Sequence, residues 1–484
     1  MMDRMAGWHL EHTYAALPPL FHAPATPTAV GEPRLIVFNR PLAIDLGLDA
    51  DALDGPEGAA IFAGNALPAG SRPIAQAYAG HQFGYFTALG DGRAILLGEQ
   101  ITPAGDRVDI QLKGPGRTPF STRGDGRAAL GPMLREYIVS EAMHALGIPT
   151  TRSLAVAATG EAVYRESRLA GAVLTRVAAS HIRVGTMQWA AAHQDREALQ
   201  ALADYTRARH YPELADAPDP HVALFDAILE RQARLIARWQ LVGFIHGVMN
   251  TDNMALSGET IDYGPCAFMD RYDPATVFSS IDSGGRYAYA NQPPIAHWNL
   301  TRLAEAMLPL FDADEERAVD RATERLDRFP ALFEQHWLDG MRGKLGLFTA
   351  EAGDRALADD LLDWMKERSA DFTSTFVSLT RGEPIADAAD VAAGAWHRRW
   401  MERRSRQPQP AAEVEAFMRR HNPAVIPRNH HVEAALQAAA GAGDLSATTR
   451  LLDVLATPYD HDRELGAFSA PAPDAPPYRT FCGT

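Results

Sequence analysis

The chain has 484 residues, a formal net charge of −15 and 46% hydrophobic residues. This acidic balance argues against general nucleic-acid binding, which depends on clustered basic charge. Two cysteines, Cys266 and Cys482, exclude a disulfide-stapled fold and a four-cysteine zinc site. No apolar run approaches the roughly 20 residues that span a bilayer, and the N-terminus lacks the long apolar segment of a secretion signal. We therefore expect a soluble, cytoplasmic, monomeric enzyme with no membrane or nucleic-acid partner.

The chain is poor in lysine, and nearly all of its basic residues are arginines. The three lysines are Lys113, Lys344 and Lys366. Lys113 follows an apolar strand-like run, where a site can require a compact ammonium group instead of a wide guanidinium. Lys344 and Lys366 lie in polar helical segments, and the pattern predicts that both are surface charges.

The N-terminal third is predicted to be rich in β-strands. Residues 1–80 indicate an irregular wrap with one strand near 35–39. Turn signals at 90–92 and 102–106 then separate three apolar runs. These runs predict an antiparallel meander with strands at 83–89, 93–100 and 107–114.

A long loop and a helix follow the meander. Residues 114–127 are rich in Gly and Arg, and a loop of this length is usually functional. An apolar stripe predicts a helix over 128–146, which Gly147 and Pro149 end. Further strands are predicted at 153–159, 162–167 and 171–178.

The remainder of the chain is predicted to be mostly helical. Apolar residues at period 3.6 predict a long amphipathic helix over 222–244. Further helices are predicted near 298–310, 313–327, 355–379, 411–420 and 429–454. The pattern thus divides the chain into a β-rich lobe (1–186), a helical lobe (187–455) and a flexible proline-rich tail (456–484).

Four polar positions occur in the order in which a protein-kinase-like fold handles ATP. They are Lys113 at a strand end, Glu136 on the next helix, Asn253 after a long helix, and Asp262 in the triplet 262–264, Asp-Tyr-Gly. In such a fold the lysine holds phosphates and pairs with the glutamate, while the Asn and Asp hold Mg²⁺. This order predicts a two-lobed α+β fold with a site for ATP and a divalent cation, since a metal with hard oxygen ligands offsets the phosphate charge.

The loop before Asn253 departs from a kinase. In kinases His is followed two residues later by the catalytic Asp, with Asn as the eighth residue. Here His246 is first and Asn253 eighth, but Val248 occupies the third position and cannot accept a proton. The nearest carboxylate is Asp252. The motif therefore favours metal–ATP binding without ordinary γ-phosphoryl transfer.

The sequence resembles the selenoprotein O family (SelO/YdiU), kinase-like protein adenylyltransferases with a pseudokinase fold. The resemblance covers nearly the whole chain. It rests on long segments at 79–94, 109–156, 175–185, 246–256, 262–270 and 291–300. It implies that ATP binds inverted relative to active kinases and that AMP passes to Ser, Thr or Tyr hydroxyls of protein substrates, with release of pyrophosphate.

The resemblance also implies roles for individual residues. Asp252 would be the general base, and Lys113 with Glu136 would hold phosphate. Asn253 and Asp262 would hold Mg²⁺ or Mn²⁺. The expected nucleotide contacts are Gly90, Gly92, Arg93, Lys113, Asp125, Gly126, Arg176, Arg183 and Asp262. Arginine's planar fork suits the phosphate contacts.

The same resemblance implies a role for the two cysteines. In the family a cysteine of the tail can pair with one near the activation segment, and Cys266 lies four residues after Asp262. We hypothesise a reversible Cys266–Cys482 disulfide that gates access to the site.

Three other functions remain open from the sequence. Transfer of UMP from UTP is one, because sequence does not fix the choice of base. A kinase that transfers the γ-phosphate is another, which Val248 argues against. The third is a non-catalytic nucleotide-binding pseudokinase, which the intact Lys113, Asn253 and Asp262 argue against.

Overall fold

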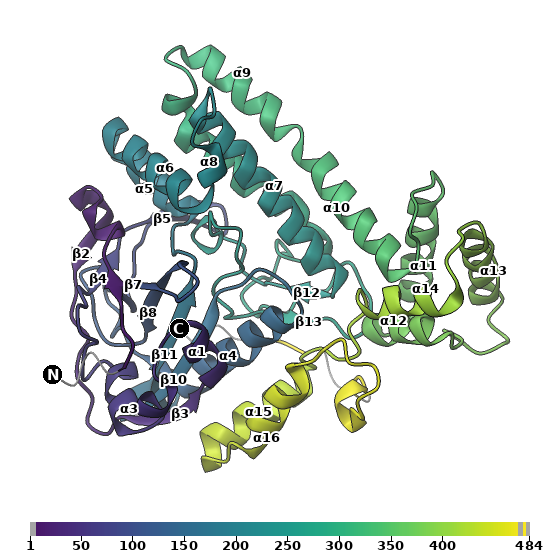
Figure 1. Cartoon of the computed structure of the whole chain (residues 1–484), viewed down its shortest axis with the longest axis horizontal. Coiled ribbons are helices and arrows are strands. Elements are labelled where there is room, and N and C mark those ends of the chain that lie inside the picture. Colours follow the sequence, from purple (N-terminus) through teal and green to yellow (C-terminus); the bar gives the residue numbers. More distant parts are fainter. Residues whose placement is uncertain (1–5, 473–477, 481–484) are drawn as a thin grey trace.

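The computed structural model describes residues 6–472 and 478–480. A large sheet dominates the N-terminal part of the chain and helices dominate the C-terminal part (Figure 1). This architecture confirms the predicted α+β class. The kinase-like two-lobed arrangement, and its boundaries at residues 186 and 455, stay predictions. Among the described residues, no helix combines the length and apolar character needed to cross a membrane.

The large sheet has nine antiparallel strands. Its main order is β2 (His22–Pro24), β4 (Ile74–Gln76), β7 (Ala94–Ile101), β8 (Arg107–Lys113), β11 (Arg168–Ala178), β10 (Arg152–Tyr164) and β3 (Arg34–Phe38). Two short strands, β1 (Leu10–Glu11) and β9 (Ala128–Ala129), pair with β7 and β11. Lys113 pairs with Ala94 on one side and Leu174 on the other. The lysine is therefore fixed between two neighbouring strands.

Strand β8 shows how the sequence separates the apolar core from the polar site. Successive side chains of a strand point to opposite faces. Ile110 and Leu112 join the apolar core on one face, packed beneath α1 (Arg40–Asp45), α2 (Ala50–Leu53) and α3 (Pro56–Phe62). The alternating Asp109, Gln111 and Lys113 are buried on the other face. One strand thus supplies both core residues and site residues.

The second face of the sheet is covered by helices from distant parts of the chain. Helix α4 (Leu130–Ala145), which matches the prediction over 128–146, packs on β10 and β11. Helices α15 (Asn429–Ala442) and α16 (Ser446–Leu455) pack against α4 in turn (Figure 1). The C-terminal helices therefore support the helix that carries Glu136.

The predicted three-stranded meander is wrong in one strand. Strand β6 (Tyr85–Ala88) pairs with β5 (Ala79–Gln82) in a separate two-stranded sheet instead of with β7. Phe83 and Gly84 both have positive φ, which forms a tight turn between β5 and β6. The two other predicted strands, 93–100 and 107–114, correspond to β7 and β8 and do pair.

Strand β10 joins two strands that the sequence separates. The predicted runs 153–159 and 162–167 belong to one hairpin arm, because β10 continues to Tyr164 with a register irregularity between Ala158 and Ala162. Gly160, with φ +73°, accommodates this irregularity.

The helical part is built around α7 (Pro220–Leu241), close to the predicted 222–244. Its other helices are α5 (Val184–Ala192), α6 (Arg196–His210), α8 (Gln292–Phe311), α9 (Glu315–Leu326), α10 (Phe329–Lys344), α11 (Asp354–Arg368), α12 (Phe372–Arg381), α13 (Val391–Ser405) and α14 (Ala411–Arg419). Short 3-10 helices lie at Tyr14–Ala16, Pro19–Phe21, Pro212–Leu214, Thr251–Asn253, Tyr289–Asn291 and Gly466–Ser469. A two-stranded ladder joins β12 (Phe244–Ile245) to β13 (Ala267–Phe268) beside the site.

Two predicted helices are each divided in the structure. The helix predicted over 355–379 ends at Ser369, which is left-handed, and Asp371 then caps α12 by accepting from Ser374 N at 2.7 Å. The helix predicted over 429–454 breaks at Gly443, with φ +67°. Local capping chemistry therefore ended helices that apolar periodicity alone predicted to continue.

Lys344 is not the surface charge that the sequence predicted. The residue is 2% exposed, and Nζ lies 4.0 Å from the ring centroid of Phe376 and 5.5 Å from that of Phe372. Burial lowers the pKa of Lys344 to about 7. Lys366, in contrast, is exposed as predicted. The difference arises because α12 folds back over the end of α10, which the helical pattern around Lys344 does not reveal.

The described part of the predicted tail contacts the body of the protein. His461 Nε2 lies 2.8 Å from Asn422 O, and Ala424 N donates to Pro458 O at 2.7 Å. Thr480 Oγ1 donates to Pro265 O at 2.7 Å. These contacts tie residues near both ends of the segment to the helical part.

Candidate active site

A cluster of two cations and two carboxylates lies where β8, α4 and β11 meet the Asp-Tyr-Gly segment. Lys113 Nζ donates to Glu136 Oε2 at 2.7 Å and also to Asp262. Arg176 Nε donates to Glu136 Oε1 at 2.8 Å, and its Nη2 lies 3.3 Å from Asp262 Oδ1. The structure therefore brings together the predicted Lys113–Glu136 pair. It also places Arg176 on the same glutamate.

The two cations keep both carboxylates ionised. Burial by itself would raise the pKa of Glu136, but Arg176 and Lys113 outweigh it and hold the pKa below its ordinary value. Burial would also raise the pKa of Asp262. Lys113, and then Arg176, outweigh this effect, so the pKa lies well below its usual range. Asp262 is also one of the few non-glycine residues with positive φ, at +66°. This strained backbone turns a charged oxygen toward both cations.

Lys113, Arg176 and Asp262 border a cavity of about 630 Å³ between the sheet and the helical part. Every predicted nucleotide or metal residue lines it: Gly90, Gly92, Arg93, Lys113, Asp125, Gly126, Arg176, Arg183, Asn253 and Asp262. Asp252 lines it as well, whereas Glu136 lies behind Lys113 and Arg176 and is absent from the wall. The volume falls within the 300–1,000 Å³ range of small-molecule sites.

Two glycines allow the loops of the wall to approach each other closely. Gly90 has φ +127°, and a Cβ there would meet the ring of Phe120. Gly126 has φ +69°, and a Cβ there would meet the backbone of Gly116. Neither position accepts a side chain without displacement of its neighbour. Asp125, beside Gly126, is held at the rim by Arg165 at 2.8 and 3.0 Å.

Asp252 is a buried carboxylate that also lines this cavity. Its Oδ1 is buried and accepts no hydrogen bond from any residue that the structure describes. Burial raises the pKa of Asp252 to about 6, against the opposing effect of Arg183. Gly80 packs directly on Oδ1, so a Cβ at residue 80 would clash with it. A carboxylate with a pKa near neutrality is suited to accept a proton.

Asn253 is oriented by the loop that contains Val248. Asn253 Nδ2 donates to Val248 O at 3.0 Å, which orients the amide, and Asn253 lines the cavity. Asn253 and Asp262 thus offer hard oxygen donors from two neighbouring segments. Mg²⁺ bound with substrate phosphates needs only one or two such protein ligands. Within the described ranges, no cluster of three or more His, Cys, Asp or Glu forms a self-contained metal site.

Arg183 has a set of partners that the sequence did not reveal. Its guanidinium lies 4.3 Å from the ring centroid of Tyr78, and Nη2 lies 3.6 Å from Asp91 Oδ1. Arg183 Nη1 also donates to the backbone oxygen of Asp252 at 3.1 Å. Sequence reasoning missed Tyr78 and Asp91. The triplet Gly90–Asp91–Gly92 indicates a turn, and the family resemblance assigns nucleotide contacts to its two glycines but not to Asp91. A lone tyrosine gives no motif.

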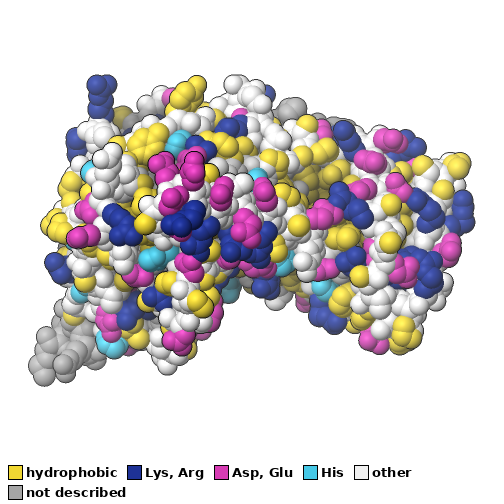
Figure 2. Space-filling view, turned by 90° about the horizontal axis from the view of Figure 1, so that it is seen from above, with side chains coloured by type: hydrophobic (Ala, Val, Ile, Leu, Met, Phe, Trp, Pro, Cys, Tyr) yellow, Lys and Arg dark blue, Asp and Glu magenta, His cyan; other side chains and the backbone are white. Residues whose placement is uncertain are grey.

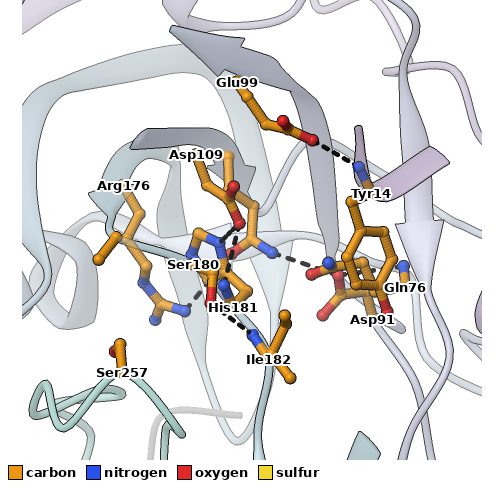
Figure 3. Close-up of polar contacts among 12 residues, drawn as sticks. Tyr14, Gln76, Asp91, Glu99, Asp109, Arg176, Ser180, His181, Ile182 and Ser257 are labelled. Atoms are coloured by element: carbon orange, nitrogen blue, oxygen red, sulfur yellow. Dashed lines mark hydrogen bonds and ion pairs between the residues drawn. The ribbon is translucent and has the colours of Figure 1, made fainter. Parts of the chain in front are cut away.

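A buried cluster of polar side chains holds the segment just before Arg183, and Figure 3 shows the contacts between Asp109 and His181. His181 N and Nδ1 each lie 2.9 Å from Asp109 Oδ2, and Arg209 Nη2 donates to Asp109 Oδ1 at 2.6 Å. Burial opposes ionisation of Asp109, but Arg209 and His181 lower its pKa to about 2. The charged Asp109 thus anchors His181 two residues before Arg183.

The remaining candidates have mainly structural surroundings. His246 is buried, with Nε2 2.9 Å from Ile261 O, and it stacks on Trp239. Cys266 is buried and forms no disulfide with any described residue, and burial raises its pKa to about 12. Cys482 lies outside the described residues, so its pairing with Cys266 stays a hypothesis.

Comparisons with known proteins identify the class of the chain. Residues 7–456 match the family described as "Protein adenylyltransferase SelO". The chain is 57% identical over 481 residues to the "Protein nucleotidyltransferase YdiU" of Bacillus cytotoxicus, covering 99% of this chain and 98% of that relative. It is 58% identical over 480 residues to that of Anoxybacillus flavithermus, covering 99% of this chain and 100% of that relative. It is also 58% identical over 484 residues to that of Geobacillus kaustophilus, with the same coverage.

These matches make the protein an enzyme of the nucleotidyltransferase class. More specifically, the chain belongs to the SelO/YdiU family. The family identified from sequence motifs is therefore confirmed.

Proposed function

We propose that this enzyme transfers AMP from ATP to Ser, Thr or Tyr hydroxyls of other proteins and releases pyrophosphate. The observation that carries the proposal is the position of Asp252. Its buried carboxylate faces the same cavity as Lys113 and Asp262, whereas the loop position of a kinase's catalytic base is taken by Val248. A base displaced in this way suits attack at a phosphate other than the γ-phosphate. ATP would bind inverted within a two-lobed, kinase-like fold.

The cations of the cavity would hold the triphosphate. Lys113 supplies a compact charge, and Arg176 and Arg183 supply planar forks that suit paired phosphate oxygens. Glu136 would act through Lys113 and Arg176 by keeping both aimed at the cavity. The glycines at 90, 92 and 126 would let the backbone approach the nucleotide, with Arg93 and Asp125 beside them.

The proposed reaction moves one proton and exchanges one bond. Asp252 accepts the proton of the acceptor hydroxyl as its oxygen forms a bond to the α-phosphorus. The bond between the α-phosphorus and the bridging oxygen breaks, and pyrophosphate leaves with that electron pair. The raised pKa of Asp252 supports this role, because a base works best when its pKa lies near the working pH.

A divalent cation fits the residues that are present. Asn253 and Asp262 would hold Mg²⁺ or Mn²⁺, since both offer oxygen donors on the cavity wall and Asn253 is already oriented by Val248. When bound, the metal would neutralise phosphate charge in the transition state.

Labelled nucleotides test the proposal directly. The protein is incubated with a cell lysate, Mg²⁺ or Mn²⁺, and ATP labelled at either the α- or the γ-phosphate. We expect the wild-type enzyme to label proteins from ATP that carries the label at the α-phosphate, and not from γ-labelled ATP. The Asp262→Ala variant should label no protein from either nucleotide. Labelling from the γ-position alone would identify a kinase, and binding without any transfer would identify a pseudokinase.

Transfer of UMP is the second candidate, because the name of the relatives, nucleotidyltransferase, leaves the base open. The same assay with α-labelled UTP, ATP and an equimolar mixture decides between them. We expect ATP to be preferred.

We also propose that a Cys266–Cys482 disulfide regulates the site. Thr480, the described residue nearest Cys482 in sequence, donates to Pro265 O at 2.7 Å, directly before Cys266. Two thiols form a disulfide only by losing two electrons, so the pair would need an oxidant such as hydrogen peroxide. The raised pKa of Cys266 makes it the less reactive thiol, so peroxide would convert the Cys482 thiolate to a sulfenic acid. The Cys266 sulfur would then bond to the Cys482 sulfur with release of water. A non-reducing peptide map of oxidised protein should contain the cross-linked pair, and two free thiols would contradict it.

A further inference from the structure

The β5–β6 hairpin is attached directly to the loop that carries Asp252. His81 N donates to Thr251 Oγ1 at 2.7 Å, and Phe83 N donates to Asn250 Oδ1 at 3.1 Å. Thr251 immediately precedes Asp252, and Asn250 lines the cavity. The hairpin therefore forms one edge of the cavity and is held in register with the proposed base.

The outer edge of β6 is unpaired among the described residues. Leu89 N donates to Tyr78 O at 3.0 Å, and β6 runs antiparallel to β5 with Phe86 opposite His81. In an antiparallel pair, inward and outward backbone groups alternate along the strand. The N–H and C=O groups of Phe86 and Ala88 therefore point away from β5. An edge of this kind is a template for another strand.

Exposed apolar side chains flank this edge. Tyr85 is 80% exposed, Phe86 49% and Ile281 56%. Ile281 and Phe83 also line the cavity. Phe83 packs on Tyr287 with ring centroids 5.2 Å apart, which holds the hairpin turn against the segment that carries Ile281. Elsewhere charges of both signs are intermixed, as Figure 2 shows for one face of the molecule.

One strand, β6, separates a segment docked on this edge from the strand that touches the base. Neighbouring strands lie about 4.8 Å apart. Gly80 of β5 touches Asp252 Oδ1, and Ala88 of β6 lines the same cavity. A third strand beside β6 would therefore run along the mouth of the cavity, and one of its side chains would extend inward.

We propose that an extended segment of the acceptor protein docks as a third strand on the edge of β6, between Tyr85 and Ala88. The inference rests on the proposed function, because this segment carries the hydroxyl that receives AMP. Main-chain hydrogen bonds to Phe86 and Ala88 provide affinity without sequence preference, and apolar neighbours of the hydroxyl residue contact Tyr85, Phe86 and Ile281. The acceptor is thus an extended, partly apolar segment instead of a folded surface.

The acceptor side of the proposal is tested with wild-type enzyme. A library of 11-residue peptides with a central Ser, Thr or Tyr and degenerate flanks is incubated with ATP labelled at the α-phosphate. The best acceptor is then resynthesised with an N-methyl group at each position in turn. If the peptide pairs as a strand, an N-methyl group at every second position should lower AMP transfer about tenfold relative to the unmethylated peptide. At the positions between them, transfer should stay within about threefold. A loss without alternation would overturn the proposal. So would labelling of lysate proteins but of no peptide.

The enzyme side is tested with a matched pair of variants. Phe86→Pro removes the outward N–H and the side chain, whereas Phe86→Ala removes the side chain alone. Proline is tolerated on an edge strand where its N–H would face solvent. We expect Phe86→Pro to raise the KM for the peptide about tenfold and Phe86→Ala about threefold. Val391→Ser, at an apolar residue on α13 that is more exposed than Phe86, should have no effect.

Affinity for a non-hydrolysable ATP analogue separates docking from nucleotide binding. It should stay within twofold for both Phe86 variants. If Phe86→Pro has the same KM for the peptide as wild type, docking on β6 is wrong, whereas the proposed transfer of AMP stands. If wild type labels no protein from α-labelled nucleotide, both fail. Light scattering tests a second copy as the occupant, and a dimer that Phe86→Pro dissociates would overturn the acceptor assignment.

Discussion

Arg183 Nη2 lies 3.6 Å from Asp91 Oδ1, and both side chains are buried in the wall of the cavity. Gln111 links this pair to a second arginine. Its Nε2 donates to Asp91 Oδ2 at 3.2 Å, and its Oε1 accepts from Arg176 Nη1 at 3.4 Å. One carboxylate therefore helps to orient both guanidinium groups that we expect to bind phosphate.

Replacing Asp91 should weaken nucleotide binding. Asp91→Asn keeps the shape of the side chain but leaves the buried Arg183 without its carboxylate, and an unpaired buried charge is costly. We expect affinity for a non-hydrolysable ATP analogue, measured by calorimetry, to fall about tenfold. Asp54→Asn removes a carboxylate from an exposed ion pair with Arg40 and serves as the control. Equal affinities for the two variants would refute the orienting role of Asp91.

The rate of transfer should depend on pH through Asp252. Only its ionised form accepts a proton, and burial raises the pKa to about 6. With acceptor and ATP kept constant, kcat/KM should rise between pH 5 and 7 and then level off. Asp252→Asn should reduce the rate at least about 100-fold, remove this step and leave affinity for the ATP analogue within threefold. A pH step near 6 that persists in Asp252→Asn would assign it to another group.

Lys113 should not tolerate arginine, although the chain uses arginine nearly everywhere else. The buried ammonium contacts Glu136 and Asp262 within one cluster, and Arg176 already occupies the other side of Glu136. A second planar guanidinium is too wide for this position. Lys113→Arg should lower AMP transfer about 100-fold or more, with weaker analogue binding. Lys366→Arg, at an exposed site, should retain wild-type rates. Full activity of Lys113→Arg would show that charge alone suffices.

The buried Lys344 should lower the free energy of unfolding of the wild-type protein near neutral pH. Its pKa is about 7 in the folded state, compared with about 10.4 in an unfolded chain. Between these values the unfolded state binds more protons, so stability rises as the pH rises from 7 to 10. Lys344→Met keeps the packing of the side chain on Phe376 but removes the charge. It should raise the free energy of unfolding by about 4 kcal/mol at pH 7.

Urea unfolding at pH 7 and pH 9.5 measures this difference. The advantage of Lys344→Met should shrink at the higher pH, because the wild-type lysine is then already neutral when folded. An advantage that is independent of pH would point to packing instead of ionisation.

Much of the candidate site was predictable because its residues carry motif information. The order of Lys113, Glu136, Asn253 and Asp262 indicated a nucleotide site, and all but Glu136 line one cavity. Asp252 was identified because Val248 removes the usual base from the loop. The apolar period of α7 and the alternation along β8 likewise follow from local chemistry.

Tertiary structure alone decided which residues became partners. Asp91 was predicted as part of a turn, yet the fold places it beside Arg183 from another segment, 92 positions further along the chain. Lys344 became buried because α12 folds over α10, and β6 paired with β5 because the turn at Phe83 and Gly84 reversed the chain early. Sequence patterns report local conformation and motif chemistry. Burial, pKa and edge exposure depend on which distant segments pack together, and those contacts form only in the folded chain.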